Sequence, residues 1–193
     1  MQIAPGVHQV RMLGADSFLL EEDRLTLIDA GMVGSRLMLE RYLRRIGRRL
    51  DELDRIICTH GHPDHIGGVG ELVRDRDDIA VLIHPDDLAG LTRPLREAMA
   101  TAESHGERRG RIIQYLTRTP ADPTPVEHGD VLQVVRGRLT YASAFFSHDH
   151  AGARGSVERL AALDVEMIAL SHYPPWRVDA NAALRELADR AAE

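Results

Sequence analysis

The chain contains no lysine, because every one of its 24 basic residues is arginine. This absence excludes enzymes that form a Schiff base on lysine, and it removes the Gly-Lys-Ser/Thr of a phosphate-binding loop. Cysteine is almost absent too: Cys58 stands alone, so no disulfide can form within the chain. A lone cysteine fits a reducing compartment, and we expect a cytoplasmic protein in which Cys58 is a buried, inert thiol.

Long apolar runs are also missing. No stretch reaches the length of a membrane span, and residues 1–6 lack the charged lead and apolar run of a signal peptide. The net charge is −6, and Arg44-Arg45 with Arg48-Arg49 form a short cationic cluster that we interpret as a solvated helix face. We therefore expect a small-molecule substrate, with no nucleic acid and no membrane as partner, and a homo-oligomer remains open.

What is present indicates one packed domain over residues 1–193. Alternating apolar residues predict an antiparallel meander with strands at Val7–Leu13, Phe18–Glu21 and Arg24–Asp29. A helix should follow, with one face formed by Leu39, Tyr42, Leu43, Ile46 and Leu50. Next we predict a strand at Arg55–Thr59, a helix from about Ile66 and a strand at Ala80–His84.

The second half has a different pattern. Residues 86–118 predict a helical insertion, and the proline-rich stretch 119–130 predicts a loop. Strands are predicted at Val131–Val135 and Leu139–Ala144, around an Arg-Gly-Arg turn. They should be followed by a helix over about 151–163, a strand at Met167–Leu170 and a helix from Asp179. The residues that we expect to face inward from the 151–163 helix are Ala153, Val157, Leu160 and Ala161.

The segment from Thr59 to Gly68 carries the chemistry. It places His60, His62, Asp64 and His65 within six residues, at a predicted strand-to-helix junction. His60 and His62 can point the same way from an extended backbone. Imidazole nitrogen and carboxylate oxygen are ligands that zinc and iron accept at about 2.0–2.2 Å, and Gly61, Gly67 and Gly68 allow close packing around them. This cluster predicts a metal site.

Histidines outside this cluster have simpler roles. His8, His105 and His128 stand alone in the sequence, and we interpret them as hydrogen-bonded core residues. We expect His84, at a strand end before a proline, to be a hydrogen-bonding loop residue and not a ligand.

The segment His60–His65 matches the His-x-His-x-Asp-His signature of the metallo-β-lactamase superfamily, which includes glyoxalase II-like thioesterases and lactonases. The sequence Asp29-Ala-Gly31 also resembles that family's Asp-x-Gly turn, and Ser171-His172 stands in the place of its late Gly-His. The resemblance implies an α/β fold, the αββα sandwich. It also implies one ion on His60 and His62, a second ion on Asp64, His65 and His172, and Asp29 behind the ligands. Asp64 is then the candidate catalytic residue, and a metal-bound hydroxide is the nucleophile.

The sequence departs from the family in its second half. The family's Pro-Gly-His turn and its later Gly-Asp, which complete the first site and bridge both ions, are missing, so an internal segment is shortened. His148, Asp149 and His150 are candidate replacement ligands, although Asp149 or Ser147 capping the helix that follows is the role we favour. The second site keeps three protein ligands, the number typical of catalytic zinc.

Three functions remain open. Hydrolysis of an ester-like bond, a thioester or lactone before a β-lactam, is the first, with one or two zinc ions and with iron or manganese as other metals. An iron-dependent sulfur dioxygenase would use similar ligands. A degenerate family member that binds one metal or none would have a structural or interaction role.

Overall fold

The computed structural model describes residues 1–83, 131–143 and 150–190. Contacts divide the chain into two compact units, Met1–Val126 and Glu127–Glu193. The single domain expected over 1–193 stays a prediction, and the expected helical insertion 86–118 and loop 119–130 lie outside the described residues. Within the described residues, no helix has both the length and the apolar character to cross a membrane.

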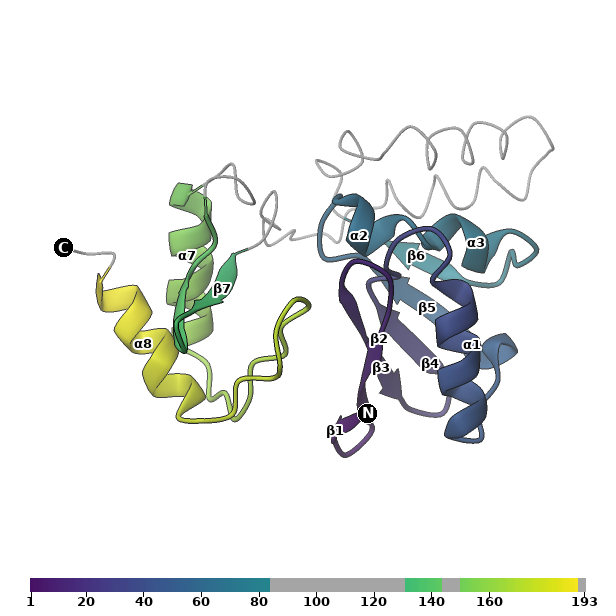
Figure 1. Cartoon of the computed structure of the whole chain (residues 1–193), viewed down its shortest axis with the longest axis horizontal. Coiled ribbons are helices and arrows are strands. Elements are labelled where there is room, and N and C mark those ends of the chain that lie inside the picture. The colour runs from purple at the N-terminus through teal and green to yellow at the C-terminus, as the bar shows by residue number, and fades with distance from the viewer. Residues whose placement is uncertain (84–130, 144–149, 191–193) are drawn as a thin grey trace. The chain divides into compact units, whose positions relative to one another are not determined.

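The first unit is built on a six-stranded sheet whose strands lie in sequence order (Figure 1). The strands are β1 Gln2–Ala4, β2 Val7–Arg11, β3 Asp16–Glu21, β4 Leu25–Ile28, β5 Leu53–Ile57 and β6 Ala80–Leu82. Pairings from β1 to β4 are antiparallel, because tight turns join those strands, whereas β4–β5 and β5–β6 are parallel. The predicted meander is confirmed. The prediction missed β1, and it began β5 two residues late and ended it two residues late.

Helices join the parallel strands. They are α1 Arg36–Arg45, the 3-10 turn η1 Leu50–Glu52, α2 Pro63–Ile66 and α3 Val69–Val73. The helix predicted near Ile66 therefore starts earlier, at Pro63, and is two short helices. Leu39 and Leu43 of α1 are fully buried, as expected.

The end of α1 corrects one prediction. Gly47 adopts a left-handed backbone with φ 75°, and the amide of Arg48 donates to the carbonyl of Leu43. This is a Schellman arrangement, which closes a helix and turns the chain away. Leu50 therefore lies in η1 and not on α1, although it still packs against the same core.

The core of the first unit lies between the sheet and its helices. Leu19, Leu25 and Leu27 from the sheet are fully buried, and they cluster with Leu39 of α1 and Leu72 of α3. Cys58 belongs to this cluster and is buried, as predicted. The core thus fixes β4 and β5 side by side, so that their carboxyl ends meet at one edge of the sheet.

The second unit pairs a two-stranded hairpin with two helices. Its elements are β7 Leu132–Val135, β8 Arg138–Tyr141, α7 His150–Ala161 and α8 Ala180–Arg190. Arg136 and Gly137 both have positive φ, as a tight two-residue hairpin requires, which confirms the predicted turn. The strand predicted at Met167–Leu170 is wrong. Only an isolated bridge from Ile168 to Trp176 forms there.

Helix α7 also differs from its prediction at one position. Ala153, Val157 and Ala161 are buried as expected, because four-residue spacing places them on one face. Leu160 lies at the margin of that face and is 36% exposed, so its inward assignment is wrong.

A buried polar network lies between the sheet and α1. His8, only 4% exposed, has its Nδ1 2.9 Å from the Tyr42 hydroxyl and its Nε2 3.0 Å from Glu21. Arg48 donates to Glu21 and to Glu52, at 2.9 and 2.6 Å. His8 is therefore a hydrogen-bonded core residue, as predicted. Arg48 is not part of a solvated helix face, which corrects that interpretation of the cationic cluster.

We predict that Glu21→Gln lowers the free energy of unfolding at neutral pH by about 1 kcal/mol, the scale of a partly exposed ion pair. Hydrogen bonds from Arg48, and then from His8, hold the pKa of the Glu21 carboxyl below its ordinary value of 4.5. A carboxyl with a lowered folded-state pKa adds stability above its unfolded pKa and loses it as the pH falls through the folded pKa. Denaturant titrations should therefore show the difference narrowing below pH 4.5.

The matched control is Glu22→Gln, which removes the same charge from an exposed neighbouring side chain. It should leave the free energy of unfolding nearly unchanged, at neutral pH and below pH 4.5 alike. Equal losses in the two variants would contradict the prediction, because net charge alone would then explain the effect.

Candidate metal centre

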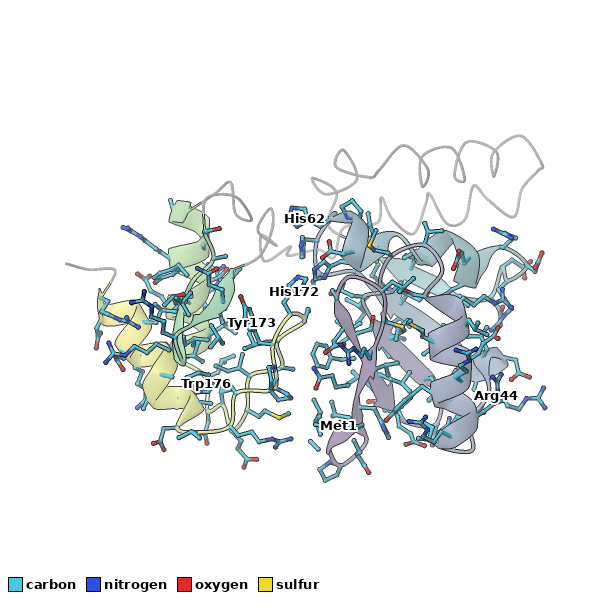
Figure 2. All side chains as sticks on the ribbon, viewed as in Figure 1. Met1, Arg44, His62, His172, Tyr173 and Trp176 are labelled. Atoms are coloured by element: carbon cyan, nitrogen blue, oxygen red, sulfur yellow. The ribbon has the colours of Figure 1, made fainter. Side chains whose placement is uncertain are left out.

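The histidine segment occupies the junction between β5 and α2. The strand ends at Ile57, and His62 is the residue before α2, with an extended backbone of φ −70° and ψ 145° (Figure 2). Pro63 stands at the first helical position, where its missing amide proton costs nothing. Asp64 and His65 therefore lie in the first helical turn, whereas His60 precedes it in the bend that joins β5 to α2.

His60 and His62 bring two nitrogen atoms together. Nε2 of His60 lies 3.0 Å from Nδ1 of His62, and the two rings meet edge to face at a centroid distance of 4.5 Å. Two nitrogen ligands of a tetrahedral zinc ion stand about 3.3 Å apart, given Zn–N bonds of about 2.0–2.1 Å. The two histidines therefore fit one shared ion.

His65 and Asp64 form a second donor pair. Nε2 of His65 lies 3.7 Å from Oδ2 of Asp64, and the other ring nitrogen, Nδ1, lies 2.7 Å from Oδ2 of Asp29. His65 and Asp29 are each only 1% exposed at their side chains, so this contact is shielded from water. A histidine held this way through one nitrogen offers the other to a metal.

Asp29 is the buried carboxylate behind these ligands. It follows β4 with a left-handed backbone of φ 59° and is completely buried. Its oxygens accept from the amide and the hydroxyl of Thr59 as well as facing His65. Hydrogen bonds of this kind are what a buried charge requires.

Two glycines let the surrounding loops approach. A Cβ on Gly14 would stand 2.6 Å from Cβ of Asp64, and a Cβ on Gly68 would stand 2.3 Å from the carbonyl oxygen of Ala30. Any side chain at either position would push the loops apart. Gly68 was expected to have this role, whereas Gly14 lies about fifty residues earlier in the chain and the sequence offered no sign of it.

The other predicted site residues are placed as follows. His172 lies in the second unit, in a loop closed by paired backbone hydrogen bonds between Ile168 and Trp176 (Figure 2). His84, His148 and Asp149 lie outside the described residues, as do His105 and His128. His150 is the first residue of α7, and its proposed role as a replacement ligand stays a prediction.

Thr59 is a second residue of this site, after Gly14, that sequence reasoning missed. Its hydroxyl lies 3.1 Å from Nδ1 of His60 and also contacts Asp29. The only sequence signal was its position directly before His60, which does not reveal a partner thirty residues away.

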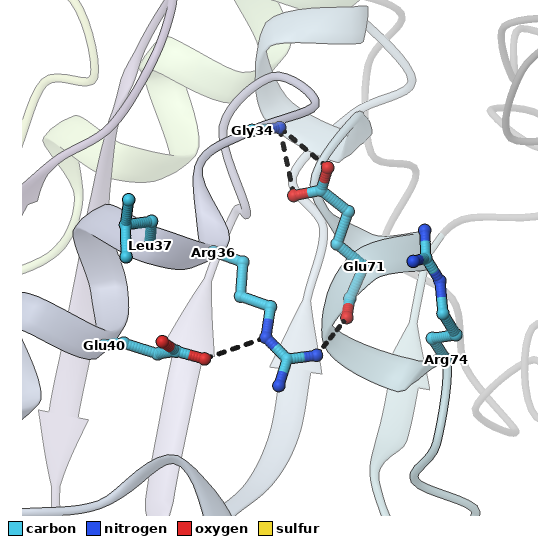
Figure 3. Close-up of a pocket in the computed structure, with 6 residues that line it drawn as sticks. All are labelled: Gly34, Arg36, Leu37, Glu40, Glu71 and Arg74. Atoms are coloured by element: carbon cyan, nitrogen blue, oxygen red, sulfur yellow. Dashed lines mark hydrogen bonds and ion pairs between the residues drawn. The ribbon is translucent and has the colours of Figure 1, made fainter.

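A separate pocket of about 390 Å³ lies between α1 and α3 (Figure 3). Arg36 donates to Glu40 and to the carbonyl of Glu71, and the Glu71 carboxylate accepts from the amide of Gly34. Most of its charged groups are thus paired within the pocket. None of the predicted metal ligands lines it.

Comparison with known proteins places this geometry in context. A model described as the metallo-beta-lactamase superfamily matches residues 10–142. Ribonuclease J of Mycobacterium tuberculosis is 35% identical over 99 residues, which cover 48% of this chain and 18% of that protein. The exodeoxyribonuclease WalJ of Streptococcus pneumoniae is 43% identical over 60 residues, which cover 31% of this chain and 22% of that protein. The chain thus spans about a fifth of the length of these relatives.

A solved B3 metallo-β-lactamase with an active-site glutamic acid shares the fold. Its TM-score is 0.64 at 16% identity, over 100% of this chain and 86% of that one. The likeness confirms the predicted α/β fold of metallo-β-lactamase type. The shortened second half agrees with the element order, because β8 ends at Tyr141 and α7 already begins at His150.

We predict that Asp29→Asn weakens zinc binding about 10- to 100-fold, the usual cost of losing the partner that orients a ligand. The amide would present its own protons to the donors of Thr59 and His65. Competition with a chromogenic chelator measures the change. Asp23→Asn, at an exposed position in the β3–β4 corner, is the charge-matched control and should bind zinc like the parent. Unchanged affinity in Asp29→Asn would contradict the prediction.

Proposed function

We propose that this chain, which belongs to the metallo-β-lactamase superfamily, is a metal-dependent hydrolase of ester-like bonds. The proposal rests on two pairs of candidate metal-binding atoms that lie at the junction between β5 and α2. Nitrogens of His60 and His62 lie 3.0 Å apart, and His65 presents Nε2 beside Asp64 while Asp29 holds its Nδ1.

The ligand assignment follows the family pattern. His60 and His62 would hold the first ion, and Asp64, His65 and His172 the second. His172 enters from the family resemblance, since it lies in the second unit. Zinc is the metal proposed, because histidine and carboxylate ligands with an open position are typical of catalytic zinc. Iron and manganese accept the same ligands.

When bound, such an ion lowers the pKa of a coordinated water and polarises the bond under attack. The chain's own residues supply position. Asp29 fixes the ring plane of His65, and the first turn of α2 fixes Asp64 beside it. Gly14 allows the β2–β3 turn to pack directly against Asp64.

The charge of the chain favours one class of substrate. The chain carries a net charge of −6, and Arg48, the part of its cationic cluster nearest the core, is engaged with Glu21 and Glu52. Strong binding to a phosphate backbone depends on free basic residues. We therefore propose a small neutral or weakly charged substrate, a thioester or lactone. Phosphodiester hydrolysis is the second candidate, because both relatives described above, and further ones, are named as nucleases.

A substrate panel on zinc-loaded protein tests the proposal. Turnover of a thioester or lactone that stops on chelation supports it. Cleavage of single-stranded RNA or DNA without turnover of those substrates would replace it with the second candidate. Oxygen uptake on a persulfide with bound iron would indicate a dioxygenase, and inactivity with no bound metal would indicate a degenerate member.

We predict that Asp64→Ala and His65→Ala each abolish hydrolysis and reduce metal content, because each removes a ligand from the set that retains three. Metal analysis and turnover are measured on the same preparations. Cys58→Ser is the control, since the thiol of Cys58 is buried in the core and takes no part in the proposed reaction. It should stay within several-fold of the parent. Normal turnover in both ligand variants would refute the assignment.

We also predict one tight zinc equivalent and a second that is weak or empty. The set with Asp64, His65 and His172 has three protein ligands, whereas His60 and His62 lack a third histidine, and water supplies no fixed geometry. His172→Ala should abolish the tight equivalent, and His148→Ala and His150→Ala should not. Two equally tight equivalents in calorimetric titration would show that other residues complete the first set.

A further inference from the structure

Thr59 stands between the buried carboxylate and the first histidine. Its Oγ1 lies 3.0 and 2.8 Å from the two oxygens of Asp29, and 3.1 Å from Nδ1 of His60. Its backbone amide also donates to Asp29, at 2.8 Å. Asp29 in turn faces Nδ1 of His65. One carboxylate is therefore linked to a ligand of each proposed ion, directly for His65 and through a hydroxyl for His60.

The single proton of the Thr59 hydroxyl determines which atoms donate and which accept among Asp29, Thr59 and His60. A carboxylate only accepts hydrogen bonds, so the proton of the Thr59 hydroxyl must point to Asp29. If it pointed to His60 instead, oxygen lone pairs would face one another at 2.8 Å. The hydroxyl then presents a lone pair to His60, which must donate from Nδ1. His60 is consequently the Nδ1–H tautomer, with a bare lone pair on Nε2.

We propose that Thr59 is a positioning residue that fixes His60 in the Nδ1–H tautomer, with Nε2 directed to the point it shares with Nδ1 of His62. Asp29, through Thr59, thereby orients a ligand of both ions. The tautomer assignment stands on this geometry alone, whereas its consequence for metal binding rests on the proposed function.

The sheet explains why these residues meet. β4 and β5 are parallel neighbours with Ile28 opposite Ile57, so the residues that follow them emerge at the same edge. Asp29, which has a left-handed backbone, accepts hydrogen bonds there from the amide and the hydroxyl of Thr59. Thr59 itself is exposed, so replacing it removes the hydroxyl without opening a cavity in the core.

The test compares Thr59→Val, which keeps the shape and loses the hydroxyl, with Thr59→Ser, which keeps the hydroxyl. Nitrogen-15 NMR of the metal-free full-length chain reads the tautomer of His60. The parent and Thr59→Ser should show Nδ1–H, and Thr59→Val should lose that preference. Thr140→Val, which removes a hydroxyl from β8, is the control and should match the parent. A parent with Nε2–H, or a Thr59→Val protein with the parent's tautomer, would overturn the proposal.

Zinc titration adds a second readout. Where His60 and His62 hold the weak second equivalent, Thr59→Val should weaken that equivalent by about tenfold, the low end for such orienting contacts, and spare the equivalent that contains His65. Where that set is empty in the parent, the NMR comparison alone decides the role of Thr59. Asp29→Asn should weaken both. If the parent binds no zinc, the proposed function fails while the NMR comparison still decides the role of Thr59. If the parent binds zinc at both sets and Thr59→Val weakens neither, the role of Thr59 in metal binding fails and the proposed function survives.

Discussion

The carboxylate of Asp29 is the group on which the arrangement of the site depends. It is completely buried, and its contacts come from Thr59 and His65, which belong to the segment after β5. A buried charge is costly unless its oxygens are hydrogen-bonded, so the donors are needed as much as the carboxylate is. The requirement works in both directions. The carboxylate stabilises one ring orientation of His65, and the positions of the donors keep Asp29 in its left-handed backbone.

The sheet makes this interaction possible. Parallel pairing of β4 with β5 brings the ends of two strands, separated by α1 in sequence, to one edge. The amide of Asp29 donates to the carbonyl of Ile57, which continues the β4–β5 pairing by one bond, and the amide of Ala30 donates to the carbonyl of His65 in α2. The site is therefore an extension of the sheet, held by the same core that fixes β4 and β5.

Two of the buried histidines that the structure describes in the first unit, His8 and His65, have different surroundings, and the contrast bears on function. His8 has both ring nitrogens engaged by Tyr42 and Glu21. Its contacts tie the N-terminal strands to α1. His65 has one nitrogen engaged by a buried carboxylate and the other beside Asp64. The first pattern is that of a structural residue, and the second is that of a histidine prepared for a ligand.

The sequence by itself determined the family, the antiparallel meander, the faces of α1 and the donor residues His60 to His65. These follow from local spacing, which periodicity and a short motif express directly. Local pattern also failed in places where partners are distant. It extended α1 to Leu50 although Gly47 ends the helix, and it proposed a strand at 167–170 where only a bridge forms.

Only the tertiary structure decided the roles of Gly14, Thr59 and Arg48. Gly14 matters because the β2–β3 turn packs on Asp64. Arg48 matters because it forms an ion pair with Glu21, which is distant in the sequence. Thr59 matters because parallel strands place it over Asp29, thirty residues earlier. Side-chain hydrogen bonds between distant segments leave no period in a sequence. They arise when the sheet and core hold two segments so that a donor and an acceptor lie about 3 Å apart, which is a property of the fold.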